Sequence, residues 1–158
     1  MKLHVLTVGH RPPAWVKAGF EEYARRMPRE LQVVLREIKP GRRDGDAAAQ
    51  SSRARTEEAE RIVAAMPSGC VKIALDERGK VLTTVQLARQ LETWMGEGRD
   101  VCFIIGGADG LDDGVKSGAD MSMALSALTL PHALVRVVLA EQLYRAVTLI
   151  RNHPYHRQ

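Results

Sequence analysis

Residues 125–158, LSALTLPHALVRVVLAEQLYRAVTLIRNHPYHRQ, decide how the rest of the chain is interpreted. They predict a short apolar strand from Leu125 to Leu130, a Pro-His break, and an apolar helix from Ala133 to Ile150. A tail rich in histidine, tyrosine and arginine follows. Because chain ends are usually frayed and chemically plain, we expect this one to carry function.

The predicted terminal helix has two apolar stripes where a surface helix has one. They consist of Val135, Leu139, Leu143, Val147 and Ile150, and of Leu134, Val137, Val138 and Tyr144. One stripe can cover a sheet, and a symmetric homodimer would cover the other. The alternative is a helix at the centre of the domain. Glu141 and Arg145 can pair, since they are one helical turn apart.

Upstream of this stretch, predicted strands alternate with predicted helices. The predicted strands are Lys2 to Val8, Leu31 to Ile38, Val71 to Leu75 and Val101 to Ile105. Three helices are predicted between them: the first begins after Pro12-Pro13, the second extends from Asp46 to Met66, and the third begins at Thr83 or Thr84. A polar turn is expected at Asp76 to Lys80, and at most a short helix between Leu111 and Met123. The alternation predicts one α/β domain with a mostly parallel sheet flanked by helices.

Gly106-Gly107-Ala108-Asp109-Gly110 directly follows the most apolar predicted strand. Glycines there let the backbone turn sharply and present N–H groups to a ligand, at the edge where open α/β sheets bind ligands. Gly107 is the candidate. The spacing fits neither a dinucleotide fingerprint nor a P-loop, and a tight strand-to-helix turn is the alternative interpretation.

Composition narrows the function classes. The formal charge of +4 and the pI of about 9.3 favour an anionic partner, although a charge of this size can also serve only to keep the protein soluble. The aromatic content of 4% disfavours a surface on which nucleic-acid bases stack. Cys70 and Cys102 adjoin apolar runs, which predicts reduced core residues. The sequence contains neither a membrane span nor a signal peptide, so we expect a cytoplasmic protein.

The tail contains His153, Tyr155, His156 and Arg157. A metal site is not expected, because no cysteine or carboxylate partner has a familiar spacing. Ser122 and Ser126 lack the context of an activated nucleophile. The residue types suit the binding of an anionic, base-containing substrate, although a solvated tail is the alternative.

Four ordered motifs together resemble a known family. They are Ile105-Gly106-Gly107-x-x-Gly110-Leu111, the LSALTLPH stretch, Arg136 to Glu141 with Leu143-Tyr144-Arg145, and NHPYHR at the terminus. With the N-terminal VGH-x-PPAWV segment, the chain is identified as a member of the RlmH family of SPOUT-class methyltransferases over essentially its whole length. It departs from many relatives at Ala108-Asp109, which leaves Gly107 in place.

The resemblance implies a fold, a reaction and a cofactor. The fold is a SPOUT domain over residues 1–158 with a trefoil knot in roughly residues 70–158, an exception to the rule that chains avoid knots. The reaction is methyl transfer from S-adenosyl-L-methionine to N3 of a pseudouridine in 23S rRNA of the assembled ribosome. The active site lies between the subunits of a homodimer.

By the same resemblance, the cofactor-binding residues are Leu75, Gly107, Leu125, Ser126, Ala127, Leu128, Thr129 and Leu130. The catalytic residues are Arg145, Tyr155, His156 and Arg157. An arginine would stabilise the negative charge that develops on the base, and His156 or His153 would take the proton. RNA contact is expected from dispersed basic clusters: Arg25, Arg26 and Arg29, the loop Lys39 to Arg43, and Arg53 with Arg55.

Two other function classes are compatible with the sequence. A non-enzymatic ribosome-binding module would bind RNA but not the cofactor. A nucleotide-dependent enzyme of another kind would use the same glycine turn, yet gives no reason for the LSALTLPH stretch or the HPYHR tail.

Overall fold

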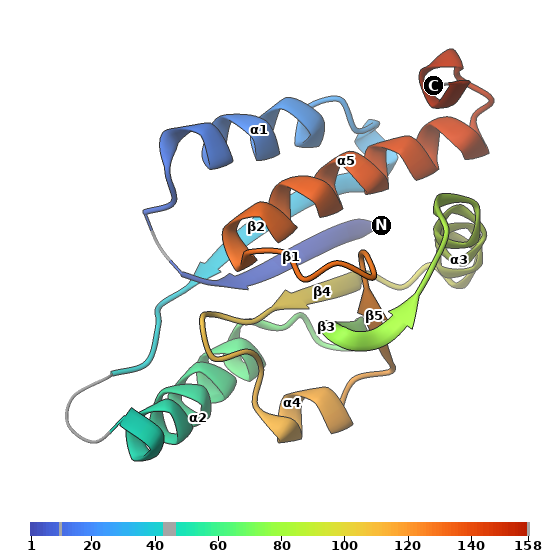
Figure 1. The fold of residues 1–158 in the computed structure, drawn as a ribbon. Helices are drawn as coiled ribbons and strands as arrows, with labels where there is room; N and C mark the ends of the chain where they lie inside the picture. The colour runs from blue at the N-terminus through green and yellow to red at the C-terminus, as the bar shows by residue number, and fades with distance from the viewer. Residues whose placement is uncertain (10, 43–46, 158) are drawn as a thin grey trace.

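A five-stranded sheet forms the centre of the computed structural model, which describes residues 1–9, 11–42 and 47–157, and their side chains except 47–50, 156 and 157. The strands are β1 (Lys2–Val8), β2 (Gln32–Ile38), β3 (Val71–Val81), β4 (Val101–Ile105) and β5 (Met121–Ala124). Their order is β2-β1-β4-β3-β5, and each neighbouring pair is parallel. The predicted α/β fold with a mostly parallel sheet is confirmed (Figure 1).

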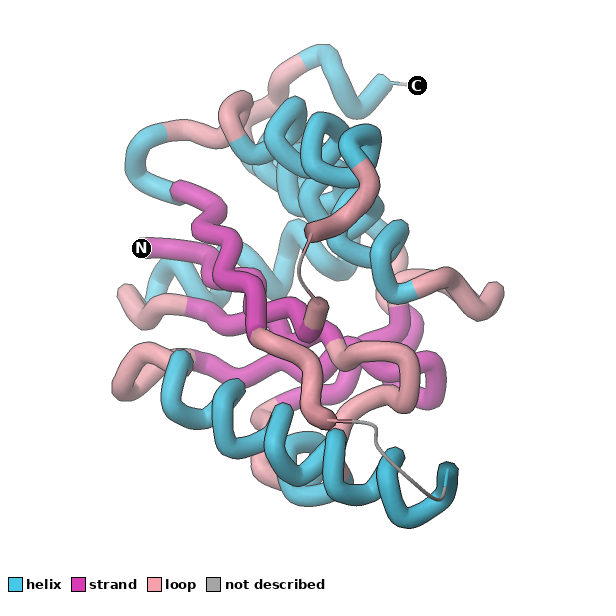
Figure 2. Tube along the Cα trace, turned by 90° about the vertical axis from the view of Figure 1, so that its left-hand side faces the viewer, coloured by secondary structure: helices cyan, strands magenta, loops and turns pink. Residues whose placement is uncertain are grey.

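Helices cover both faces of this sheet (Figures 1 and 2). The helices α1 (Ala14–Ala24), α3 (Thr84–Glu97) and α5 (His132–Ile150) lie on one face, whereas α2 (Ala47–Ala65) and α4 (Asp113–Ser117) lie on the other. Two apolar cores result: Val5, Phe103 and Leu139 belong to the first, and Leu6, Ile104 and Ile62 to the second. Every residue of β4 is buried, which explains its uninterrupted apolar sequence.

The ends of the described helices mostly follow the expected signals. Thr83 caps α3 in a reciprocal capping box with Gln86, and Gly98 ends that helix in the left-handed conformation at φ +68°. Single 3₁₀ turns are found at Arg29–Leu31, before β2, and at Pro154–Arg157, in the tail. The expected start of the second helix, Asp46, lies outside the described residues.

Two predicted elements near the third strand are wrong. Asp76 to Lys80 is not a separate turn, because β3 continues through it to Val81 with a register shift between Leu75 and Lys80. The predicted fifth strand at Leu125 to Leu130 is a loop, and the strand that pairs with β3 is Met121–Ala124. Gly79 allows this pairing, since a Cβ on it would lie 2.6 Å from the backbone nitrogen of Met123.

The terminal helix α5 lies between α1 and α3 on the sheet (Figure 1). Leu139, Leu143 and Val147, from the first predicted stripe, are buried in the core. The second stripe is half-buried and partly covered by α1, because Tyr144 makes an edge-to-face contact with Tyr23 at 6.4 Å. Helix α1 of the same chain therefore covers part of the second stripe, for which the sequence predicted a homodimer partner.

Both cysteines are free and buried, as predicted. Burial raises the pKa of the Cys102 thiol to about 12, and the neighbouring Cys70 raises it further in the same direction. Within the part of the chain that the structure describes, no helix has the length and apolar character needed to cross a membrane.

The stability of the fold should therefore fall in alkali. Above about pH 9 a thiol of ordinary pKa loses its proton in the unfolded chain, while buried Cys102 keeps its proton. The unfolded state then binds fewer protons, so the free energy of unfolding decreases as pH rises. Urea unfolding at about pH 8 and about pH 10 measures this slope. The Cys102→Ala variant should show a flatter pH dependence, and an equal slope in both proteins would contradict the assignment.

Candidate functional site

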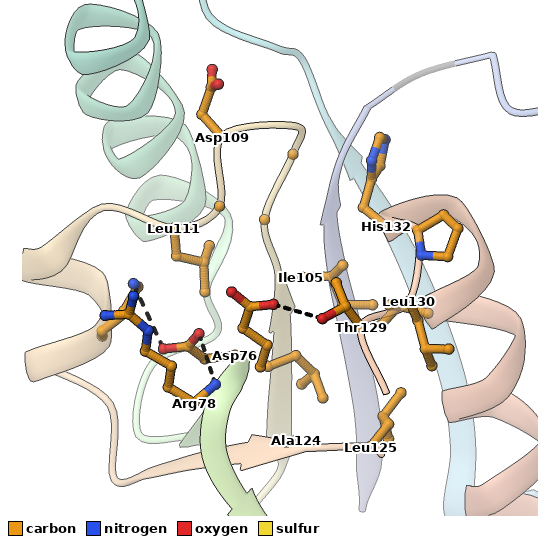
Figure 3. A pocket seen from close by; sticks show the side chains of 18 of the residues that line it. Asp76, Arg78, Ile105, Asp109, Leu111, Ala124, Leu125, Thr129, Leu130 and His132 are labelled. Atoms are coloured by element: carbon orange, nitrogen blue, oxygen red, sulfur yellow. Dashed lines mark hydrogen bonds and ion pairs between the residues drawn. The ribbon is translucent and has the colours of Figure 1, made fainter. Parts of the chain in front are cut away.

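A cavity of about 830 Å³ opens at the carboxyl ends of the central strands (Figure 3). Residues 75–78 after the regular part of β3, residues 105–111 after β4, and the loop between β5 and α5 form most of its wall. Arg55 of α2 and Lys116 of α4 also line it. This is the edge where parallel α/β sheets bind ligands.

The turn after β4 requires its glycines for steric reasons. A Cβ on Gly106 would lie 2.6 Å from the carbonyl carbon of Gly110, and one on Gly107 would lie 3.0 Å from Val8 Cγ1. Gly110 has φ +76° and donates its N–H to the carbonyl of Gly107 at 3.0 Å. The close approach keeps the turn narrow, so that its backbone faces the cavity.

Replacing Gly106 by alanine should therefore damage the pocket more than the fold. The added Cβ must displace the backbone of Gly110, and we expect a loss of stability of about 1–3 kcal/mol and at least about tenfold weaker cofactor binding. Calorimetry with S-adenosylmethionine and thermal unfolding measure the two effects.

Gly96→Ala is the matched control, because nothing lies within 4 Å of the added Cβ in helix α3. It should stabilise the helix by roughly 0.5–1 kcal/mol and leave binding unchanged. Equal effects of the two substitutions would contradict a steric role for Gly106.

The loop from Leu125 to Leu130 forms one wall of the cavity. Its turn is held by Ser126 Oγ, which accepts the Leu128 N–H at 2.9 Å, and Thr129 Oγ1 donates to Glu77 Oε2 across the cavity at 3.1 Å (Figure 3). Leu128 is 74% exposed although it is apolar. Its side chain therefore offers apolar surface to a ligand in the cavity.

Nearly all sequence-predicted cofactor residues meet here. The lining residues include Leu75, Gly107, Leu125, Ser126, Leu128, Thr129 and Leu130, whereas Ala127 is not among them. Sequence reasoning missed Asp76, Glu77 and His132. The position of Asp76 and Glu77 directly after an apolar strand was the available signal, but these residues also fit the polar turn predicted from Asp76 to Lys80.

Two of the predicted catalytic residues form a second cluster, at the far end of α5. Arg145 Nη2 lies 2.7 Å from Glu141 Oε1, and Tyr155 Oη donates to the same oxygen at 3.2 Å. The Arg145 guanidinium lies over the Tyr155 ring at 5.0 Å, and that ring is 4.7 Å from the Tyr144 ring. The predicted pairing of Glu141 and Arg145 is confirmed.

Tyr155 remains a hydrogen-bond donor across the physiological pH range. Desolvation, followed by its contacts with Tyr23 and Glu141, raises the pKa of the phenol to about 12. His153 is exposed, and its Nδ1 accepts the backbone N–H of Tyr155 at 3.2 Å. The side chains of His156 and Arg157 lie outside the described residues, although their backbone belongs to the final 3₁₀ turn.

The cavity and the Arg145 cluster lie at opposite ends of α5. Val135, near its start, lines the cavity, and Arg145 follows ten residues later, roughly 15 Å along the helix axis. Figure 1 shows the C-terminus on the side of the sheet away from the carboxyl ends of β1 and β4. Among the side chains that the structure describes, Arg145 and Tyr155 do not reach the cavity of their own chain.

No group of three or more histidine, cysteine or carboxylate side chains among the described residues is arranged to hold a metal ion.

Comparison with known proteins agrees with the fold. Residues 1–156 match the family described as "Predicted SPOUT methyltransferase". The chain belongs to the SPOUT methyltransferase family, which confirms the family and enzyme class predicted from the sequence.

Relatives within this family match the chain end to end. Proteins of Paraburkholderia phymatum and Thiobacillus denitrificans, each named ribosomal RNA large subunit methyltransferase H, are 59% identical over 99% of both chains. Among solved structures, a methylase-family protein of Haemophilus influenzae Rd KW20 has a TM-score of 0.56 at 14% identity, covering 98% of this chain and 69% of its own. A Legionella pneumophila methyltransferase in complex with SAM has a TM-score of 0.50 at 12% identity, covering 93% and 66%.

Proposed function

We propose that the protein is an S-adenosylmethionine-dependent methyltransferase that modifies N3 of a pseudouridine in 23S rRNA of the assembled ribosome, in the cytoplasm. The observation that carries this proposal is the coincidence of the cofactor residues, predicted from the family motifs, with one cavity at the ligand-binding edge of the sheet. The full-length relatives named as methyltransferases of large-subunit ribosomal RNA support the substrate.

The cavity has properties that suit S-adenosylmethionine. Its volume lies within the range of small-molecule sites. Apolar side chains of Ile105, Leu125 and Leu130 would pack against the adenine, while backbone groups of the glycine turn and of the loop would bond its edges. Leu128, exposed in the free protein, would be covered.

The knot and the single-domain organisation belong to the same proposal. Residues 1–158 form one domain, with the knot in roughly residues 70–158. In support, β5 pairs at the edge of the sheet beyond β3, and the chain then returns so that α5 packs over β4 in the centre. The returning segment is the loop that lines the cavity.

A homodimer would complete the active site. In an antiparallel pair of α5 helices, the Arg145 cluster of one subunit would lie beside the cavity of the other. Such a pair would bring the two parts of the active site together, although they lie at opposite ends of α5 within one chain. Leu134 and Val138, half-buried on α5, are available for the contact.

The chain's own side chains account for the remaining chemistry. S-adenosylmethionine, when bound, supplies an activated methyl group, so the protein must mainly align and deprotonate the base. Arg145, held by Glu141, would stabilise the negative charge on the carbonyl oxygens flanking N3. Tyr155, which stays protonated, would donate to the base. His156 or His153 would accept the N3 proton, and Arg157 would bind a phosphate.

RNA contact would come from exposed basic residues. Lys39 and Arg42 are exposed in the loop after β2, and Arg61 shapes that loop by donating to the Lys39 and Pro40 carbonyls at 2.8 and 2.9 Å. Arg25 and Arg26 pair with Glu22, which reduces their net contribution. Arg29 and Arg53 are also exposed, Arg55 lines the cavity, and Arg43 lies outside the described residues.

Calorimetric titration with S-adenosylmethionine separates this proposal from a non-enzymatic ribosome-binding module. We expect saturable binding of one molecule per chain. A folded protein that binds ribosomes but not S-adenosylmethionine would be the non-enzymatic module, and the proposal would be wrong.

The substrate should be an assembled particle and not free RNA. The chain is one small domain whose basic residues are dispersed, so it needs a preformed RNA surface to gain sufficient affinity. Ribosomes lacking the methyl group and RNA fragments of the same region can be compared at equal concentration. We expect methylation of ribosomes to be at least about 100-fold more efficient. Equal rates would contradict the requirement.

A further inference from the structure

A buried arginine on α5 has no role in the pocket or in the Arg145 cluster. Arg136 is 2% exposed, and its Nε and Nη1 atoms have no hydrogen-bond partner among the described residues. Burial lowers the pKa of this guanidinium, and Glu37 acts in the opposite direction, but an arginine in a protein stays charged. A buried cation with unused donors is costly. This position therefore calls for an anion.

The neighbours of Arg136 do not fully meet this need. Glu37 Oε1, on β2, lies 3.8 Å from Arg136 Nη1, which is too long for a hydrogen bond. Thr7 pairs with Glu37 in the β1–β2 register, so both side chains point to the face that α5 covers, and Thr7 Oγ1 is buried without a partner. Nη2 lies near the chain at the end of β1, because a Cβ on Gly9 would be 3.9 Å from it.

Arg136, Thr7 and Glu37 lie between the cavity and the basic loop that follows β2. Thr7 is beside Ile105 in the β1–β4 register, and Ile105 lines the cavity, as does Val135, which precedes Arg136. On the other side, β2 leads from Glu37 to exposed Lys39 and Arg42. Figure 1 shows the carboxyl ends of β1 and β2 beside the start of α5. An RNA chain that enters the cavity with its target base would pass over this point.

We propose that Arg136 and Thr7 form a receptor for a phosphodiester group of the RNA substrate, and that the Glu37 carboxylate occupies its place when RNA is absent. The inference rests on the proposed function. A phosphate offers acceptor oxygens to Arg136 Nε and Nη1 and to the Thr7 hydroxyl. The Glu37 side chain is 34% exposed, so its carboxylate can turn toward solvent and give way. Arg136 does not line the cavity, which makes the RNA and not the cofactor the source of the anion.

Two substitutions with opposite expected effects test the receptor. Glu37→Gln removes the competing charge, so the KM for ribosomes lacking the methyl group should fall about threefold or more, while S-adenosylmethionine affinity is unchanged. Arg136→Met should raise that KM about tenfold and reduce the salt dependence of ribosome binding by about one counterion. Glu92→Gln, an exposed carboxylate on α3 with the same change in charge, is the control and should leave KM unchanged.

An ordinary structural ion pair predicts a different result, because losing either partner would then lower stability and neither loss would improve KM. An unchanged or raised KM in Glu37→Gln overturns the inference, and this variant decides even where Arg136→Met does not fold. Absence of methyl transfer by the wild-type protein would instead count against the proposed function.

Discussion

Removing residues 154–158 is expected to abolish methyl transfer while leaving the fold and S-adenosylmethionine binding intact. The final turn packs on α5 through the Tyr144–Tyr155 ring contact and is remote from the cavity of its own chain. Its loss should therefore affect only the site to which the tail contributes. Activity should fall by at least about 10³-fold, since the deletion removes Tyr155, His156 and Arg157 together. Calorimetry and methyl-transfer assays on the same preparation measure both properties.

Mixed dimers sharpen this prediction. A chain that lacks the tail but has an intact cavity is combined with a Gly106→Ala chain that has an intact tail. At a low S-adenosylmethionine concentration, where the Gly106→Ala parent is impaired and the tailless parent is inactive, the mixture should gain activity at one of its two sites if the tail acts on the partner's cavity. Failure to recover activity, with mixed dimers demonstrated by mass, would show that the tail serves its own chain.

Replacing Arg145 by alanine should lower kcat by about 10²- to 10³-fold, which is the usual effect of removing a charge-stabilising donor. The affinity for S-adenosylmethionine should be unchanged, because Arg145 does not line the cavity of its own chain and its proposed contact in the dimer is with the base and not with the cofactor. Single-turnover transfer to ribosomes, together with calorimetry, separates the chemical step from binding.

Arg151→Ala is the matched control for Arg145→Ala. Arg151 lies at the same end of α5, is exposed, and pairs with Glu30. Surface ion pairs contribute little, so we expect activity within about twofold of wild type. A similar loss in both variants would indicate that positive charge at this end acts generally, and that Arg145 has no specific role.

Regular alternation of strands and helices was predictable, because β1 and β4 are short, mostly buried strands that each end at a glycine, Gly9 and Gly106. The error at Leu125 to Leu130 has a physical cause. Apolar residues there were attributed to strand burial, yet Leu128 is largely exposed in the cavity wall. A run of apolar residues fits packing within a sheet and equally fits contact with a bound ligand. The sequence alone does not distinguish the two.

The separation of the two clusters was not predictable from spacing alone. Sequence motifs place Arg145 and Gly107 in one active site, but no local pattern indicates that the two ends of α5 lie toward opposite ends of the strands, on one face of the sheet. Arg136 belongs to one of the family motifs, but the motif alone assigns it no role. Its signal was an arginine within an otherwise apolar helix segment, and its meaning depended on Thr7 and Glu37, which come from distant strands.

The central claim is that this chain transfers a methyl group to ribosomal RNA, and it can be measured directly. Purified protein is incubated with labelled S-adenosylmethionine and ribosomes lacking the modification, and the labelled nucleotide is mapped. The account predicts label at N3 of one pseudouridine in 23S rRNA, at about one methyl group per ribosome. Label in ribosomal protein or at scattered nucleotides, or no transfer by a protein that binds the cofactor, would contradict it.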